Sequence, residues 1–485
     1  MNERIKDYLT RVFGETNTKL YEDLIETPAF SYLRVNTLSS SMDELLKIFN
    51  SRYNIQTSPV KNIDFALRVV KDPESVVGRT FEHNNGYYYI QSLSSMLPPL
   101  VLNPLPGESV LDLCAAPGSK TTQIAAMMKN QGELIANEVQ NDRLRTLIFN
   151  LERMDVLNCG VVHERGEWLG RMFNSYFDKI LVDVPCSGLG ILQKKSEVNL
   201  WWNEKNVEGL TQLQYRLIVS AIKMLKPGGT LVYSTCTLTY EENEEIVDKA
   251  IAKYPVEIVD FDLGVETVEG YTDINGKRFS NHLAKTKRIL PWEAKSEGFY
   301  IAKMIKTGET ESLREEFKKA TSIASVSKKE MKAYLNIIND AYGTNNDYWD
   351  DFNFFKIGDQ FFISSSELNP TSPASYERIG TKFGNSEKNS RFTLNPLFAR
   401  VIGKEISKNI AELNSEQAMN NYMSGSLCGS DEFELVEFTG IKDVAVKFAG
   451  KIIGTGVLTG ESLKSRFPKT HRQRSFVYSS KRDLE

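Results

Sequence analysis

The stretch Leu111-Asp-Leu-Cys-Ala-Ala-Pro-Gly-Ser-Lys120 runs from a short apolar segment into small residues, and Thr121-Thr-Gln-Ile-Ala-Ala126 continues it as the start of a helix. Because Ser109-Val-Leu-Asp-Leu113 has the pattern of a buried strand, the whole segment predicts a strand, a tight loop and a helix. Small residues let the backbone of such a loop approach a ligand, and the helix N-terminus offers N–H groups to an anion. The segment contains no GxGxxG pattern, which speaks against a dinucleotide ligand.

The chain from residue 87 to about residue 306 alternates between strand-like and helix-like patterns. Residues 209–225 have a helical pattern that ends at Lys226-Pro-Gly-Gly229, a strong stop and turn signal. Such alternation is typical of an α/β fold, so we predict a Rossmann-like sheet of parallel strands covered by crossover helices. The predicted strands are 109–113, 133–137, 178–182, 230–234 and 298–304.

The flanking regions have different patterns. A helical opening, a strand at Tyr32–Thr37 and a helix at Ser41–Phe49 with Glu44 at the capping-box position predict a small α+β, RNA-recognition-like domain. Downstream we predict a charged helix over 311–341, a hairpin over 352–364, loops over 369–390 and three strands at 433–438, 443–448 and 452–458. The predicted domains are 1–85 (α+β), 86–306 (Rossmann-like), 307–390 (helical and hairpin connection) and 391–485 (a mostly β module).

Composition limits the possible classes of protein. The chain has 485 residues, 41% of them hydrophobic and 25% charged, which describes a globular protein of several domains. No stretch approaches the roughly 18 unbroken apolar residues of a membrane span, and the N-terminus lacks a signal core, so we expect a cytoplasmic protein without membrane contact. Five cysteines without a CxxC pair and only four histidines argue against a disulfide scaffold and against a metal site.

The charge is distributed unevenly. The net charge of −4 speaks against indiscriminate binding of nucleic acid, which needs basic surface. The C-terminal end is nevertheless basic, with Lys and Arg interleaved with aromatic residues from Glu461 onward. This tail is either a solvated segment or a contact surface for RNA.

Two further segments each place a cysteine directly after a strand-like run. These are Leu181-Val-Asp-Val-Pro-Cys-Ser-Gly188 and Tyr233-Ser-Thr-Cys-Thr237. Because the carboxyl ends of parallel strands meet at one edge of a sheet, we expect Cys186, Cys236 and Asp183 to lie near the loop at 114–120. Two thiols and a carboxylate at such an edge favour covalent nucleophilic chemistry. We expect the other cysteines, Cys114 included, to have packing or backbone-contact roles.

The three segments, in this order, resemble the Sun-type (Nop/Sun) family of S-adenosylmethionine-dependent RNA 5-methylcytosine methyltransferases. Arg34-Val-Asn-Thr37, Tyr88-Tyr-Ile-Gln-Ser-Leu-Ser-Ser95 and Arg288-Ile-Leu-Pro291 extend the resemblance. It implies a class I methyltransferase fold, S-adenosylmethionine as cofactor and RNA as partner. The extended C-terminus is similar to bacterial ribosomal-RNA members with a PUA-like last domain. Ribosomal RNA is therefore favoured over transfer RNA, and we expect a monomer.

The resemblance also implies roles for individual residues. Cys236 corresponds to the nucleophile that adds to carbon 6 of cytosine, Cys186 to the cysteine that assists product release, and Asp183 to a residue beside the base. Glu138, at the end of the second predicted strand, is the predicted ribose ligand, as acidic residues are in nucleotide sites. The implied cofactor-binding residues are Cys114, Ala115, Ala116, Pro117, Gly118, Ser119, Lys120, Glu138 and Asp183.

The chain departs from the family pattern at three places. Arg165 stands where an acidic residue usually approaches the adenine, so Glu164, Glu167 or packing alone would take over that contact. Ser92 replaces a usual acidic residue, which predicts a less firmly positioned loop. After Gly188, Gln193-Lys-Lys195 replaces an Arg-rich segment and is suited to contact phosphates as point charges.

Other functions fit the sequence less well. A DNA 5-cytosine methyltransferase would use a Pro-Cys cysteine as nucleophile and lack the Ser-Thr-Cys-Thr segment. A dehydrogenase would need the dinucleotide fingerprint. The alternatives that stay open are a transfer-RNA 5-methylcytosine methyltransferase and a non-catalytic RNA-binding assembly factor.

Overall fold

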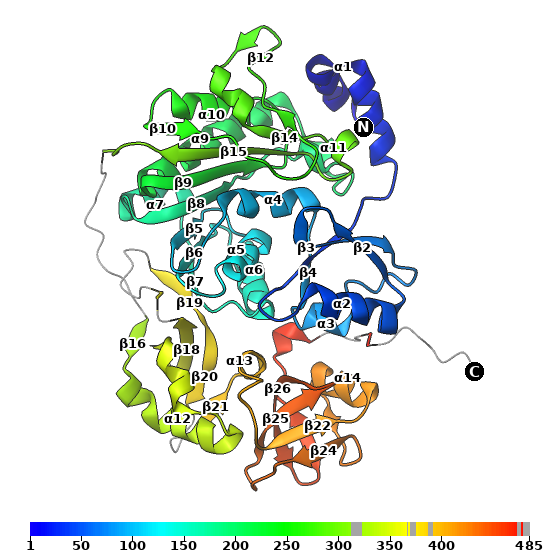
Figure 1. Cartoon of the computed structure of the whole chain (residues 1–485), viewed down its shortest axis with the longest axis vertical. Coiled ribbons are helices and arrows are strands. Elements are labelled where there is room, and N and C mark those ends of the chain that lie inside the picture. The colour runs from blue at the N-terminus through cyan, green and yellow to red at the C-terminus, as the bar shows by residue number, and fades with distance from the viewer. Residues whose placement is uncertain (312–322, 366, 369–374, 387–390, 473–476, 479–485) are drawn as a thin grey trace.

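The computed structural model contains four regions (Figure 1). It describes all residues except 312–322, 366, 369–374, 387–390, 473–476 and 479–485. The central sheet forms the upper body, the N-terminal sheet lies at its side, and two β-rich units lie below. Among the described residues, no helix has both the length and the apolar character needed to cross a bilayer.

The central domain is built on a mixed sheet with a parallel centre. The described residues place ten strands in it, of which nine run in the order β11-β14-β15-β9-β8-β5-β6-β7-β19 and β10 (Val256–Ile258) pairs with β15. The five central strands are mutually parallel: β5 (Ser109–Asp112), β6 (Glu133–Asn137), β7 (Cys159–Val162), β8 (Phe177–Asp183) and β9 (Leu225–Thr235). The predicted Rossmann-like fold is confirmed for this part of the sheet.

The expectation of an entirely parallel sheet is wrong at its edges. Beyond β9, the strands β15 (Phe299–Lys306), β14 (Lys287–Ile289) and β11 (Val268–Glu269) are antiparallel to their neighbours. The connection between β14 and β15 holds only the four-residue α11 (Pro291–Ala294), too short for the crossover that parallel neighbours need. As a result, the start of β15 lies beside the end of β9, where Tyr300 pairs with Thr235.

Helices cover both faces of the central sheet, because alternate residues of its strands point to opposite sides. Leu111 faces a core that includes residues of α7 (Gly166–Met172), α9 (Glu204–Met224) and α10 (Glu244–Ile251). Val110 faces a second core with α4 (Leu93–Leu102), α5 (Ser119–Met127) and α6 (Asn141–Arg153). The predicted helix at 209–225 is confirmed, with an earlier start at Glu204.

The N-terminal region forms an antiparallel sheet in the order β2-β3-β1-β4. Its strands are β1 (Tyr32–Val35), β2 (Gln56–Val60), β3 (Ile63–Lys71) and β4 (Tyr88–Ile90), and α2 (Met42–Ile48) begins after Ser41, whose side chain accepts a hydrogen bond from the Glu44 N–H. The predicted strand and helix are confirmed. The opening helix α1 (Glu3–Ile25) packs instead on the central domain, where Tyr21 donates a hydrogen bond to the Leu189 carbonyl.

The connecting region contributes to two sheets. The predicted hairpin is confirmed as β17 (Phe352–Ile357) and β18 (Gln360–Ser365), preceded by β16 (Ala324–Val326) and α12 (Lys328–Tyr342). Part of the predicted 311–341 helix lies outside the described residues. The loop prediction for 369–390 is wrong at its centre, because β19 (Tyr376–Ile379) pairs with β7 and β20 (Thr381–Ser386) pairs with β18. A composition rich in turn residues hid these short strands.

The C-terminal region is a six-stranded, mostly β module, as predicted. It contains α13 (Pro396–Val401), β22 (Ile410–Leu413), α14 (Glu416–Ser424), β23 (Leu427–Cys428), β24 (Phe433–Val436), β25 (Asp443–Phe448), β26 (Lys451–Thr459) and β27 (Ser462–Ser465). Arg400 binds Asp155 at 2.5 Å, and His471 stacks on Phe149 with ring centroids 4.3 Å apart. The module is therefore docked on the end of α6. Lys481 and Arg482 of the predicted basic tail lie outside the described residues.

Candidate active site

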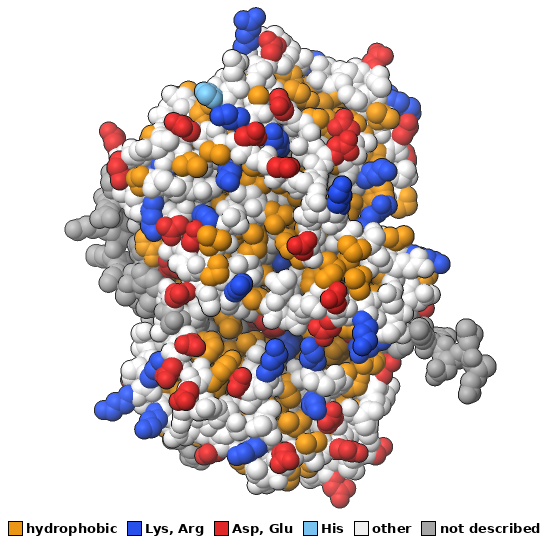
Figure 2. Space-filling view, viewed as in Figure 1, with side chains coloured by type: hydrophobic (Ala, Val, Ile, Leu, Met, Phe, Trp, Pro, Cys, Tyr) orange, Lys and Arg blue, Asp and Glu red, His pale blue; other side chains and the backbone are white. Residues whose placement is uncertain are grey.

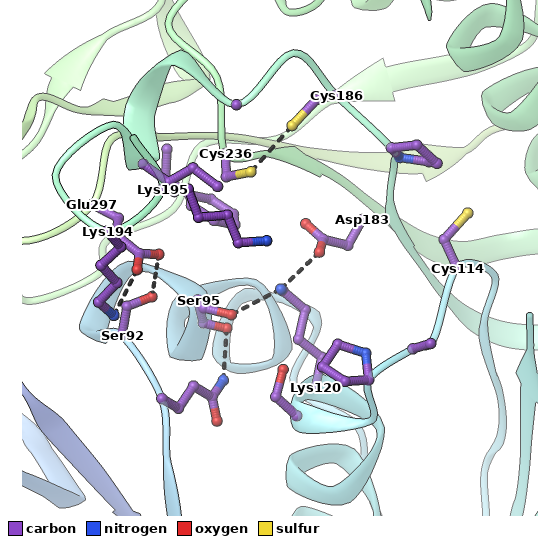
Figure 3. Close-up of a pocket in the computed structure, with 18 of the residues that line it drawn as sticks. Ser92, Ser95, Cys114, Lys120, Asp183, Cys186, Lys194, Lys195, Cys236 and Glu297 are labelled. Atoms are coloured by element: carbon purple, nitrogen blue, oxygen red, sulfur yellow. Dashed lines mark hydrogen bonds and ion pairs between the residues drawn. The ribbon is translucent and has the colours of Figure 1, made fainter. Parts of the chain in front are cut away.

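A cavity of about 760 Å³ lies at the carboxyl ends of β5, β8 and β9 (Figure 3). This is the edge of the sheet at which α/β proteins bind ligands. Segments that are far apart in sequence line it, including β4, the loop after β5 and the residues before β15. Of the site residues predicted from sequence, those that line the cavity are Cys114, Ala116, Pro117, Ser119, Lys120, Asp183, Cys186 and Cys236.

The loop before α5 is held from behind by α6. Asn150 donates a hydrogen bond to the Pro117 carbonyl at 2.9 Å, and Arg143 donates one to the Ala116 carbonyl at 2.5 Å. Gly118 has φ of +103°, and a Cβ there would approach the Leu147 side chain to 3.0 Å. Ala115 is buried behind the loop. The glycine therefore permits both the turn and its close packing on α6.

A buried carboxylate lies under this loop and was not identified from the sequence. Asp112, at the end of β5, accepts a hydrogen bond from the Thr121 hydroxyl at 2.7 Å. Burial raises the pKa of Asp112 to about 7, because the ionised form has lost its water. The predicted strand contained this residue, but its pattern gave no sign of a titrating group.

Lys120 and Asp183 form an ion pair at the centre of the cavity. The Lys120 Nζ lies 2.7 Å from Asp183 Oδ2 and 2.8 Å from the Ser95 hydroxyl. Asp183 Oδ1 accepts a hydrogen bond from Ser234 at 2.7 Å, so both carboxylate oxygens are fixed. Burial alone would lower the pKa of Lys120, but the ion pair with Asp183 outweighs it and raises that pKa. Lys120 is therefore a permanent cation in this site.

The two cysteines of the predicted site lie in contact. Cys186 Sγ is 3.2 Å from Cys236 Sγ (Figure 3). The hydrogen bond with Cys236, together with burial, raises the pKa of Cys186 well above its ordinary value. Cys186 therefore holds its proton more firmly than an ordinary thiol does. We refer to Lys120, Asp183, Cys186 and Cys236 as the floor of the cavity.

A second buried carboxylate ties the two cysteine loops together. Glu242 accepts a hydrogen bond from the Ser187 N–H at 2.8 Å, from Thr239 at 2.6 Å and from Gln214 at 2.9 Å, and it also binds the Ser187 hydroxyl. Ser187 in turn hydrogen-bonds Thr237 at 2.7 Å. Sequence reasoning missed Glu242, because it lies in an acidic run that is typical of a helix start.

The opposite wall supplies a further carboxylate. Glu297, just before β15, accepts a hydrogen bond from Ser92 at 2.6 Å and binds the Lys194 ammonium at 2.7 Å. The sequence predicted a less firmly positioned loop at Ser92. In the structure, the Ser92 side chain is held by its hydrogen bond to Glu297. The three residues come from segments far apart in sequence, and no local motif links them (Figure 3).

Glu138 and the residues near Arg165 lie outside the cavity lining. Glu138 is only 3% exposed, accepts a hydrogen bond from the Gln140 N–H at 2.9 Å and lies 3.5 Å from Arg143. Arg165 binds Glu167 at 2.7 Å and lies over the Trp168 ring. Glu164 accepts the Arg165 N–H at 2.8 Å. The ribose role of Glu138 stays a prediction, as does the choice of an adenine contact.

The described residues contain no group of three or more His, Cys, Asp or Glu side chains arranged to hold a metal ion. The residues that converge on the cavity are instead two thiols, an ion pair and a backbone loop at a helix N-terminus.

Comparison with known proteins shows to which family the chain belongs. Residues 99–305 match the family model described as 16S rRNA methyltransferase RsmB/F. Over 468 residues the chain is 33% identical to a ribosomal RNA small subunit methyltransferase F of Vibrio parahaemolyticus, which covers 92% of this chain and 93% of the relative. The chain belongs to the RsmB/F family.

Other relatives of this RsmB/F family member support the same conclusion. It is 39% identical over 307 residues to a tRNA (cytosine(49)-C(5))-methyltransferase of Pyrococcus abyssi, covering 61% of this chain and 97% of the relative. A solved methyltransferase homologue from Pyrococcus horikoshii, 33% identical, covers 63% of this chain and all of its own, with a TM-score of 0.56. The family predicted from the sequence and its methyltransferase activity are confirmed.

Proposed function

We propose that this protein transfers a methyl group from S-adenosylmethionine to carbon 5 of a cytosine in RNA, through a covalent adduct between Cys236 and carbon 6. The observation that carries the proposal is the 3.2 Å contact between Cys186 and Cys236 beside the Lys120–Asp183 pair. A non-catalytic RNA-binding factor would have no use for two thiols in one cavity.

Carbon 5 of cytosine is a weak nucleophile, and a thiolate at carbon 6 activates it. The Cys236 sulfur forms a bond to carbon 6, the ring electrons move toward N3, and carbon 5 becomes enamine-like. In this proposal Asp183, which is held by Lys120 and Ser234, hydrogen-bonds the N3 and N4 edge of the base. The fixed charges need little rearrangement as the ring becomes charged, which lowers the barrier.

Release requires the loss of the carbon 5 proton. Cys186 lies in contact with the nucleophile. It first releases its own proton to solvent, and the resulting thiolate, a strong base because of its raised pKa, then accepts the proton from carbon 5. When that proton leaves carbon 5, the electron pair re-forms the C5–C6 double bond and expels the Cys236 thiolate. The two cysteines thus have successive roles.

The residues present fit S-adenosylmethionine. The loop at 114–120 consists of small residues that lie on the cavity side of the α5 N-terminus, where N–H groups suit a carboxylate. Gly118 allows the backbone to turn there without a side chain. Cys114 to Lys120 would hold the methionine end and Glu138 the ribose. When bound, the cofactor supplies an electrophilic methyl group.

Ribosomal RNA is the favoured substrate. The relative from Vibrio parahaemolyticus, named for ribosomal RNA, matches 92% of this chain, including the C-terminal module. The relative named for transfer RNA matches 61%. Because the match to the ribosomal-RNA relative reaches into the C-terminal module, we infer that this module is a PUA-like unit that binds RNA.

Bisulfite sequencing of ribosomal and transfer RNA from cells with and without the gene tests this function. We expect one or more protected cytosines in ribosomal RNA to lose protection when the gene is deleted. A change confined to transfer RNA would show that transfer RNA, and not ribosomal RNA, is the substrate. No change in either RNA would refute the function.

A further inference from the structure

The segment that follows the Cys186 loop forms one rim of the cavity. Gly190 and Gly298 are joined by a backbone hydrogen bond of 2.8 Å, and Gln193 donates a hydrogen bond to the Leu24 carbonyl at 3.0 Å. Leu192 and Val198 are each 3% exposed and pack against α1 and its neighbours. The segment is therefore anchored at several points, so its remaining side chains are presented in a defined way.

Two neighbouring lysines in this segment have different surroundings. Lys194 is bound to Glu297 and so helps to fix the segment to the opposite wall. Lys195 lines the cavity and extends toward the side that holds Cys236 and Asp183 (Figure 3). Within the described part of the chain, no hydrogen bond or ion pair holds the Lys195 side chain, although Glu197 lines the same cavity. Lys195 is thus a cation left available to a ligand.

Two neighbouring tryptophans also differ in this way: one is packed within the protein and the other is exposed at the cavity. Trp202 is 2% exposed and packs edge-on against Tyr8, with ring centroids 5.3 Å apart. Trp201 is 40% exposed, lines the cavity and stacks on no other aromatic ring of the described residues. Its neighbour Leu200 is 87% exposed. An anchored, exposed indole at the mouth of a site is suited to stack on a planar ligand.

The charge around this rim fits an anionic partner. The protein as a whole carries a net charge of −4, and basic and acidic side chains are interspersed over most of the face in Figure 2. General attraction of RNA is therefore weak, and local cations beside the cavity gain importance. An ammonium group and an indole that line one cavity are suited to a phosphate and a base of the same RNA strand.

We propose that Lys195 and Trp201 form the entry site for the RNA strand. Lys195 binds a backbone phosphate next to the target nucleotide, and Trp201 stacks on a neighbouring base, while Lys194 and Trp202 hold the segment in place. The proposal rests on the proposed function, since it takes the cavity to accept an RNA nucleotide.

The test is the binding of a fluorescent, single-stranded ribosomal RNA oligonucleotide to the full-length protein at several salt concentrations. We expect Lys195→Ala to reduce the slope of log K against log salt by about 0.7, the contribution of one phosphate contact to a single strand. Lys195→Arg should restore it. The control Lys19→Ala removes an exposed cation of α1 that is paired with Asp23 and does not line the cavity, so it should leave the slope unchanged.

Trp201 is tested in the same assay. Trp201→Ala should weaken binding roughly tenfold with an unchanged salt slope, because stacking releases no counterions. Trp201→Phe should retain most of the affinity, and thermal denaturation of each variant reports whether the segment stays folded. Equal slopes for Lys195→Ala and the unaltered protein, or equal affinity after Trp201→Ala, would overturn the proposal.

A separate measurement tests whether Lys195 instead changes the reactivity of the Cys236 thiol. The pH dependence of Cys236 alkylation without RNA should be the same with and without Lys195→Ala. A shift in that profile together with unchanged RNA binding would assign Lys195 to the nucleophile. Binding and alkylation need no methyl transfer, so failure of this inference is distinguishable from failure of the proposed function.

Discussion

The floor and the rim of the cavity use the same kinds of residue in opposite ways. On the floor, Lys120 is bound to Asp183, and Cys186 lies against Cys236. On the rim, Lys195 has no partner among the described residues and Trp201 is 40% exposed. Groups that carry out chemistry are held by other groups of the protein before substrate arrives. Groups that bind the substrate have no partner within the described part of the protein, so their interactions form only when the substrate is present.

The largest effect should come from the cysteines of the floor. Cys236→Ala should abolish both methylation and any covalent RNA adduct, because it removes the proposed nucleophile. Cys186→Ala should still form the adduct and accumulate it, because the carbon 5 proton is not removed. Denaturing gels with labelled RNA distinguish the two.

Cofactor binding must be intact in both cysteine variants for this comparison. An adduct from Cys236→Ala with none from Cys186→Ala would exchange the two roles and make the floor resemble a DNA-methyltransferase site.

The next effect concerns the ion pair of the floor. Asp183→Asn removes the partner of Lys120 and the group facing the base, and we expect kcat to fall roughly 10²- to 10⁴-fold. RNA affinity and its salt slope should stay close to those of the unaltered protein. Steady-state methylation kinetics together with the RNA-binding assay check this. If a fall in RNA affinity accounted for the whole loss of activity, Asp183 would act in RNA binding, and the separate roles of floor and rim would be wrong.

Glu242 tests how the floor is supported. Glu242→Ala leaves Ser187, Thr239 and Gln214 without their buried acceptor, so the free energy of unfolding should fall by roughly 2–4 kcal/mol. Adduct formation should slow, because the two cysteine loops lose their common anchor. Urea denaturation and the adduct time course measure the two effects. Glu242→Gln keeps the side-chain size and should be milder; equal stability in all three proteins would contradict this role.

A smaller effect is expected where the cofactor is bound. Glu138→Ala should weaken S-adenosylmethionine binding roughly tenfold and leave RNA binding unchanged, since this residue lies on neither floor nor rim. Calorimetric titration measures the affinity, with NAD as a ligand that should not bind. Undiminished binding would remove Glu138 from the ribose site.

The last effect concerns pH. Because the pKa of Asp112 is raised to about 7, the folded protein binds a proton that the unfolded chain has lost above about pH 4. Stability from this group therefore falls by about 1 kcal/mol per pH unit between about pH 4 and pH 7. Asp112→Asn cannot titrate, so its unfolding free energy should depend less on pH in that range. Parallel curves for both proteins in urea denaturation would rule this out.

The sequence by itself determined the central domain and most of the floor. The loop at 114–120 and both cysteine segments are local motifs, each directly after a strand. Parallel strands end at one edge of a sheet, so strand order alone brings Cys186, Cys236 and Asp183 together. The family resemblance then assigned their roles, which no local pattern of charge or hydrophobicity indicates.

Tertiary structure alone decided which polar groups have partners. Glu297 binds Ser92 and Lys194, and Glu242 binds two cysteine loops, through contacts between segments that no sequence motif connects. Lys194 and Lys195 are adjacent and chemically identical, yet only the former meets a carboxylate. Whether a polar side chain has a partner within the protein or is free to bind a ligand depends on which other segments pack against it. That packing is set by the fold of the whole chain.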